Sequence, residues 1–326
     1  MMRMTGAELT VRLLERQGVR TICGIPGGAI LPLYDALSQT DKIHHVLARH
    51  EQGAGFMAQG MARVSGQPEV CFASSGPGAT NLVTAIADAC LDSIPMVAIT
   101  GQVPQSMIGT DAFQEVDIYG ITVPITKHNF LVRSAQELLE VIPDAFRIAM
   151  SGRPGPVLVD VPKDVQNEVI EFADFPPPAV PDKAPEIDMD ALETAARMIN
   201  EAERPVLYLG GGVVSSGASS LAITLAEQAS MPTTMRRPNM VTRLRVTSRA
   251  HIRRTVQPIE TKMPLITHQA LRAFMKRSIT TRTRREPCHA SLVRRSRRPS
   301  MMRARSLWVW IWQGSGSRAW AATPSS

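Results

Sequence analysis

The first 160 residues alternate between short apolar runs and longer stretches with helical periodicity, and this alternation constrains the fold more than any other feature. Each apolar run followed by an amphipathic stretch is typical of a βα unit. Repeated βα units form a parallel sheet with helices on both faces. The sequence therefore predicts a doubly wound α/β domain, with strands at 20–24, 43–48, 69–74, 95–100 and 156–161 and helices at 5–17, 29–37, 52–64, 79–91 and 135–150.

Segments rich in glycine and proline follow three of these strands, at 24–28, 75–78 and 101–104. In an open α/β sheet, ligands bind outside the carboxyl ends of the strands, which is where these segments are expected. Glycine lets a ligand approach the backbone closely. The segments are therefore candidate ligand loops, although tight turns without a ligand explain them equally well.

A proline-rich stretch divides the chain. Residues 173–185 contain five prolines in thirteen residues, a composition incompatible with a helix or a central strand. The predicted organisation is a first domain at 1–172, a linker at 173–188 and the start of a second α/β domain at 189–235. This second domain is expected to be incomplete, with a helix at 189–202, a strand at 205–209, a glycine turn at 210–212 and a helix at 221–229.

The charge distribution changes sharply after Met235. Residues 1–235 contain 15 Lys or Arg and 27 Asp or Glu, whereas residues 236–326 contain 21 and 2. The basic segment has no clear periodicity and is predicted to be disordered. A shift of reading frame near codon 235 is the favoured explanation. The alternative is a functional basic arm that binds nucleic acid through its arginine clusters.

Composition excludes several other classes of protein. No apolar run reaches the roughly 18 residues that a membrane span needs. The amino terminus lacks the pattern of a signal peptide, and the four cysteines lack metal-ligand spacing. A cytoplasmic protein with no structural metal is therefore expected.

Glu51 is the strongest single candidate for chemistry. It follows an apolar strand and begins a helix rich in small residues. A partly desolvated carboxylate at this position is suited to hold or pass a proton near neutrality. The other interpretation is an ordinary acidic residue that stabilises the first turn of a helix.

Six long strings give a specific resemblance. They are GIPGGAILPLYDAL, ARHEQGAGFMAQGMAR, SSGPGATNLVTAIADACLDSIPMVAITGQVP, IGTDAFQEVDIYGITVPITKH, SGRPGPVLVDVPKDVQ and RPVLYLGGGV. Their order and spacing resemble those of acetolactate synthase large subunits of the bacterial type, and the similarity covers nearly all of residues 4–235.

The resemblance implies that the first domain binds the aminopyrimidine of thiamine diphosphate. Glu51 matches the glutamate that hydrogen-bonds this ring and promotes loss of the reactive proton of the cofactor. Loops lining the same side of the site are matched by Pro26, Gly27, Gly28, Pro77 and Asn81.

Further positions match substrate and flavin contacts. Phe113 and Gln114 match residues near the reacting carbon, and Lys163 matches a lysine at the mouth of the substrate channel. The implied catalytic residues are thus Glu51, Gln114 and Lys163. FAD contacts are implied for Arg153, Gly210, Gly211 and Gly212, although a surface salt bridge and a simple turn are alternatives.

The implied reaction joins decarboxylated pyruvate to pyruvate or 2-oxobutyrate in the synthesis of valine, leucine and isoleucine. A homodimer and a regulatory small subunit are implied as well. Pyruvate oxidases and 2-oxoacid decarboxylases share the architecture and remain alternatives, as does a non-enzymatic fragment. The Gly-Asp-Gly motif that binds Mg²⁺ and the diphosphate in this family is absent, so the isolated chain is expected to be inactive.

Overall fold

The computed structural model describes residues 1–203, 205–235 and 308–311. The chain divides into two compact units, Met1–Asp182 and Lys183–Ser326, and the division falls within the proline-rich stretch. Within the described ranges, none of the helices combines the length and the apolar character that a membrane crossing requires.

The first unit is built on a six-stranded sheet whose neighbouring strands are all parallel. The strand order is β3-β2-β4-β5-β7-β6, so β3 lies on one side of β2 and all later strands lie on the other, where β7 returns to fit between β5 and the edge strand β6. This order confirms the predicted doubly wound α/β class. The strands are β2 (Thr21–Gly24), β3 (His44–Leu47), β4 (Glu69–Ala73), β5 (Met96–Gln102), β6 (His128–Leu131) and β7 (Pro156–Pro162).

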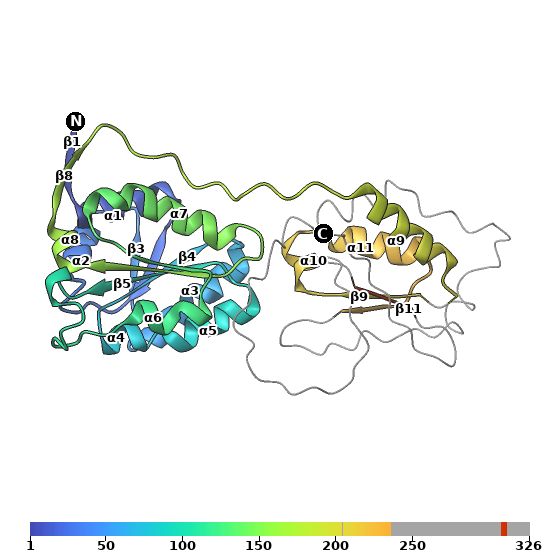
Figure 1. Ribbon diagram of the computed structural model, residues 1–326, viewed down its shortest axis with the longest axis horizontal. Coiled ribbons are helices and arrows are strands. Elements are labelled where there is room, and N and C mark those ends of the chain that lie inside the picture. Colours follow the sequence, from blue (N-terminus) through green and yellow to red (C-terminus); the bar gives the residue numbers. More distant parts are fainter. Residues whose placement is uncertain (204, 236–307, 312–326) are drawn as a thin grey trace. The chain divides into compact units, whose positions relative to one another are not determined.

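Helices cover both faces of the sheet (Figure 1). One face packs against α1 (Gly6–Arg16), α2 (Leu31–Ser38) and α7 (Leu138–Met150). The other packs against α3 (Glu51–Ser65), α5 (Val83–Asp92) and α6 (Ile118–Thr122). Within β5, Val97 and Ile99 point to the first face, whereas Met96 and Ala98 point to the second. All seven residues of β5 are buried, as expected for a strand covered on both sides.

The amino terminus forms a strand before its first helix. β1 (Met2–Thr5) pairs antiparallel with β8 (Val169–Phe172), which closes the first unit. Thr5 then caps α1, because its hydroxyl accepts from the backbone N–H of Glu8 at 3.2 Å and the Glu8 carboxylate accepts from the Thr5 N–H at 2.8 Å. This capping box fixes the start of α1.

The second unit is smaller. Its helices are α9 (Met189–Glu201), α10 (Gly211–Ser215) and α11 (Ser219–Gln228), and β9 (Pro205–Leu209) pairs parallel with β10 (Thr233–Met235). β11 (Trp308–Ile311) pairs antiparallel with β9. The expected disorder of the basic segment stays a prediction, because apart from β11 that segment, at 236–307 and 312–326, lies outside the described residues.

Candidate active site

The strand order predicts a crevice at the carboxyl ends of β2 and β4. The loop after β2 leads to α2 on one face of the sheet, whereas the loop after β4 leads to α5 on the other face. Loops that diverge in this way leave an opening between the ends of two parallel strands. The glycine-rich loops 24–28 and 74–78 follow these two strands, so both reach the crevice.

Glu51 lies at this edge, as the first residue of α3. The Nδ1 of His50 accepts from the backbone N–H of Gln52 at 3.1 Å, which fixes the start of the helix. The Nδ2 of Asn81 donates to Glu51 Oε2 at 2.8 Å, and the carboxylate is half-buried. A Cβ added to Gly78 would lie 3.4 Å from Glu51 Oε1. Asn81 thus fixes one carboxylate oxygen, while Gly78 leaves room beside the other.

Tyr34 lies close to the same carboxylate. Burial raises the pKa of Tyr34, and the nearby Cys71 and Glu51 act in the same direction. The hydroxyl is buried and has no hydrogen-bond partner among the described residues. A side chain at Gly24 would collide with it. The end of β2 at Gly24 therefore lies beside a buried polar atom whose hydrogen-bonding capacity is unused.

The loop after β2 is held by the strand next to it. A Cβ added to Gly27 would lie 2.6 Å from the Cβ of Ser74, and the Ser74 hydroxyl accepts from the backbone N–H of Ala29 at 3.3 Å. A Cβ added to Gly28 would meet nothing within 4 Å. Gly27 is needed for packing, whereas the backbone at Gly28 is open to a ligand. Pro26 is exposed beside them.

Gly76 and Gln114 are pressed together. Gly76 has φ 57° and ψ −120°, and Gln114 has φ 58°, so both lie in the left-handed half of backbone space. A Cβ added to Gly76 would lie 2.5 Å from the carbonyl oxygen of Gln114. This contact brings the exposed Phe113 and Gln114 to the loop that contains Pro77 and Asn81.

Replacing Gly76 with alanine is expected to destabilise the first unit by about 2 kcal/mol, because the methyl group adds backbone strain and displaces Gln114. Gly109→Ala is the matched control, since Gly109 has φ 77° but open space around it. Free energies of unfolding of the two variants, measured in urea, would separate the cost of backbone strain from the cost of the collision with Gln114. Equal losses of stability would show that the contact with Gln114 carries no cost.

Lys163 lies at the same edge, directly after β7. It begins the short helix α8 (Lys163–Asn167), in which the amide of Gln166 donates to the carbonyls of Ala29 and Val161 at 2.8 Å each. Asp164 accepts from the backbone N–H of Gln105 at 3.2 Å. Helix α8 is therefore tied both to the loop after β2 and to the loop after β5.

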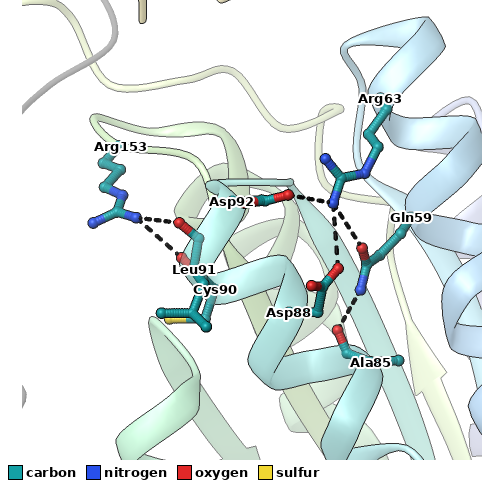
Figure 2. A network of polar contacts seen from close by, with 8 residues as sticks. All are labelled: Gln59, Arg63, Ala85, Asp88, Cys90, Leu91, Asp92 and Arg153. Atoms are coloured by element: carbon teal, nitrogen blue, oxygen red, sulfur yellow. Dashed lines mark hydrogen bonds and ion pairs between the residues drawn. The ribbon is translucent and has the colours of Figure 1, made fainter. Parts of the chain in front are cut away.

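Arg153 lies at the opposite edge of the sheet. Figure 2 shows its guanidinium directed at the carboxyl end of α5, where it donates to the carbonyls of Leu91 at 2.8 Å and Cys90 at 3.2 Å. Its Nε donates to the Ser93 hydroxyl at 2.6 Å. A cation stabilises the carboxyl end of a helix. Arg153 therefore bonds the carboxyl end of α5, at the edge of the sheet opposite Glu51.

A second polar network holds α3 against α5 (Figure 2). The Nη2 of Arg63 donates at 3.2, 3.3 and 2.8 Å to side chains of Gln59, Asp88 and Asp92. The amide of Gln59 donates in turn to the Ala85 carbonyl. A Cβ added to Gly55 would lie 2.6 Å from the Cβ of Ala85, so the helices are in close contact. Helix α3, and with it Glu51, is held firmly in place.

The structure thus gathers most of the predicted residues at one edge. Those at the carboxyl ends of the strands are Pro26, Gly27, Gly28, Glu51, Pro77, Asn81, Phe113, Gln114 and Lys163. Arg153 lies at the amino ends, and Gly210, Gly211 and Gly212 begin α10 in the second unit. Sequence reasoning missed Ser74, Tyr34 and Gln166. Only the serine pair that precedes Gly76 offered a signal, as polar residues leading into a glycine turn.

Comparison with known families agrees with this geometry. Residues 4–121 match the family described as thiamine pyrophosphate enzyme, N-terminal TPP binding domain, and residues 192–239 match thiamine pyrophosphate enzyme, central domain. Thiamine pyrophosphate is another name for thiamine diphosphate. The chain therefore belongs to the thiamine pyrophosphate enzyme family.

Several similar proteins within that family are acetolactate synthases. The chain is 64% identical over 233 residues to the acetolactate synthase isozyme 1 large subunit of Escherichia coli, and this matched region is 72% of the chain and 41% of the relative. It is 53% identical over 232 residues to the large subunit of Corynebacterium glutamicum, which covers 71% and 37%. The predicted resemblance is confirmed, and the chain spans about two fifths of the length of these relatives.

Proposed function

We propose that this chain supplies the aminopyrimidine half of a thiamine diphosphate site in an acetolactate synthase large subunit. The observation that carries the proposal is the bond between Glu51 Oε2 and Asn81 Nδ2, 2.8 Å long, at the carboxyl edge of the sheet. The proposed reaction is the carboligation of pyruvate with pyruvate or 2-oxobutyrate in the synthesis of branched-chain amino acids. The names of the similar proteins support it.

The residues at the crevice fit an aminopyrimidine. Gly78 leaves space beside Glu51 Oε1, Gly28 exposes its backbone, and the Tyr34 hydroxyl has no partner among the described residues. When bound, thiamine diphosphate supplies a carbanion that adds to the carbonyl carbon of a 2-oxoacid. Asn81 keeps Oε2 of Glu51 occupied, so Oε1 is the oxygen that holds or releases the proton.

Substrate contacts are proposed for the residues around this proton site. Phe113 and Gln114 are exposed at the loop that rests on Gly76, where they would contact the second 2-oxoacid. Lys163 lies at the end of β7, where a cation attracts the carboxylate of the substrate. Gln114 and Lys163 would therefore act with Glu51 in the reaction.

The remaining parts of the proposal concern FAD, metal and assembly. FAD would contact Arg153 and the turn at Gly210, Gly211 and Gly212, where a Cβ added to Gly210 would meet nothing within 4 Å. The described parts of the chain contain no cluster of three or more His, Cys, Asp or Glu side chains that could hold a metal ion such as Mg²⁺. The words "large subunit" in the names of the relatives support a smaller regulatory subunit as a partner. A homodimer and a cytoplasmic location are proposed from the resemblance described in the sequence analysis.

The alternative functions have less support. The similar proteins named above are acetolactate synthases, which does not favour a pyruvate oxidase or a 2-oxoacid decarboxylase. The basic arm proposed to bind nucleic acid lies, apart from the backbone of β11, outside the described residues.

A graft tests the proposed function. Residues 4–235 would replace the corresponding part of the Escherichia coli isozyme 1 large subunit, and acetolactate formation from pyruvate would be measured with and without thiamine diphosphate. Cofactor-dependent activity within about tenfold of the parent is expected, because the identity in this region is 64%. A folded graft that binds thiamine diphosphate but forms no acetolactate would contradict the proposed reaction.

A further inference from the structure

A buried carboxyl group lies between the two central strands that lead to the site. Asp160, in β7, is 1% exposed and is the register partner of Thr100 in β5. Its Oδ1 accepts from the Thr100 hydroxyl at 2.7 Å, and its Oδ2 accepts from the Nε2 of Gln102 at 3.0 Å. None of the roles assigned above uses this group.

Gln102 links this carboxyl group to the loop that follows β5. Its Nε2 also donates to the carbonyl of Val116 at 3.0 Å, and its Oε1 accepts from the backbone N–H of Val103 at 2.9 Å. Val103 and Val116 are the two ends of the loop 103–116. One amide side chain therefore closes the base of the loop that carries Phe113 and Gln114.

The two bonds to the loop require a single orientation of the Gln102 amide. If the amide turned over, its oxygen would face the Val116 carbonyl and its NH₂ group would face the Val103 N–H. Like groups would then oppose each other at both ends of the loop. A carboxyl oxygen next to Nε2 prevents this rotation of the amide. It accepts a hydrogen bond from the NH₂ group, whereas it would repel the amide oxygen. Asp160 provides that oxygen.

We propose that Asp160 is a positioning residue, which orients the Gln102 amide so that it holds both ends of the loop carrying Phe113 and Gln114. The link to catalysis rests on the proposed function. The hold on the loop needs only a lone pair on Oδ2, so it persists whether or not Oδ1 carries a proton. The buried partners of Asp160, Thr100 and Gln102, are 0% and 2% exposed, so water does not replace either bond.

The test compares variants that keep or remove this acceptor. Asp160→Asn keeps an oxygen for Gln102 and can donate its NH₂ to Thr100, whereas Asp160→Leu removes the acceptor. Gln102→Leu breaks the hold directly. Thr100→Val is the matched control, because it removes the other bond to Asp160 without touching Gln102.

Hydrogen–deuterium exchange of the full chain would be followed at the amides of Val103, Gln105 and Glu115. These amides bond Gln102 Oε1, Asp164 and the Ala112 carbonyl. In Asp160→Leu and Gln102→Leu, they are expected to exchange about tenfold faster relative to core amides of β4. Asp160→Asn and Thr100→Val are expected to exchange within about twofold of the parent chain.

Two results would overturn the proposal. Loop exchange in Asp160→Leu equal to that of the parent, with Gln102→Leu faster, would show that Gln102 needs no help from Asp160. If the loop amides of Thr100→Val exchange as fast as those of Asp160→Leu, the effect is a general loosening of β5 against β7 and not a loss of the Gln102 orientation. If Asp160→Leu does not fold, Asp160→Ala removes the same acceptor without apolar bulk, and the same outcomes apply. Exchange requires no cofactor, so this test is independent of the graft experiment.

Discussion

Replacing Glu51 with glutamine is expected to lower acetolactate formation by about a hundredfold or more in the grafted large subunit. Glutamine keeps the size of the side chain and can still bond Asn81, but it cannot accept a proton. A positioned acid or base contributes about 10²- to 10⁴-fold to a rate. The measurement is the steady-state rate from pyruvate at saturating thiamine diphosphate.

Glu69→Gln is the matched control for this prediction. Glu69 is also half-buried, but it begins β4 and so lies at the amino ends of the strands. Its replacement is expected to change the rate less than threefold. If Glu51→Gln retains more than a third of the activity while Glu69→Gln behaves the same way, Glu51 is only a helix-capping acid, and the proton role assigned to it is wrong.

The sequence predicted the central strands well because both of their faces are buried. The expected strands at 69–74, 95–100 and 156–161 correspond to β4, β5 and β7 within two residues at each end. A continuous apolar run between glycine-rich turns is typical of a strand that is covered on both faces of a parallel sheet. Because β5 is buried on both sides, its apolar run alone was enough to predict it.

Three strands of the first unit were missed, each for a physical reason. β6 is a four-residue edge strand that contains His128 and Asn129, so it lacks an apolar run. β1 and β8 pair across more than 160 residues, and nothing local in either predicts a partner so distant. The expected helix at 5–17 begins at Thr5. In the structure, Thr5 is the last residue of β1, which pairs with β8, and the capping box starts the helix only at Gly6.

The expected helix at 79–91 is divided in the structure. Pro77 begins the short α4 (Pro77–Thr80), and α5 starts at Val83. The break places Asn81 between the two helices, where its side chain can reach Glu51. Periodicity continues through the break, so only the three-dimensional arrangement reveals that this irregular joint serves the site.

The site was predictable to the extent that topology alone places residues at one edge. Glu51 and Gly28 each follow a strand, and the carboxyl ends of parallel strands must meet. Contacts made through side chains across the sheet were not predictable. Asp160 was read as part of an apolar run, and its bond to Gln102 depends on the register between β5 and β7.

The second large effect is expected in the free energy of unfolding, which depends on pH through the Asp160 carboxyl. Burial raises the pKa of the Asp160 carboxyl to about 7 from its ordinary value of 3.8, and the hydrogen bonds from Thr100 and Gln102 only partly oppose this. The folded state therefore binds the proton more tightly than the unfolded state. Protonation favours folding, and this contribution is fully present below pH 3.8 and is lost as the pH rises through 7.

Comparison with Asp160→Asn isolates this contribution, because asparagine does not titrate and all other groups are shared. The free energy of unfolding of the parent chain, minus that of the variant, is expected to fall by about 3 kcal/mol between about pH 5 and about pH 8. Exchange of core amides in β5, measured at several pH values, gives both free energies for the first unit. A difference that stays constant over this range would mean that the buried carboxyl is ionised throughout. Asp160 would then hold Gln102 as a full negative charge, and its burial would have to be compensated by groups other than Thr100 and Gln102.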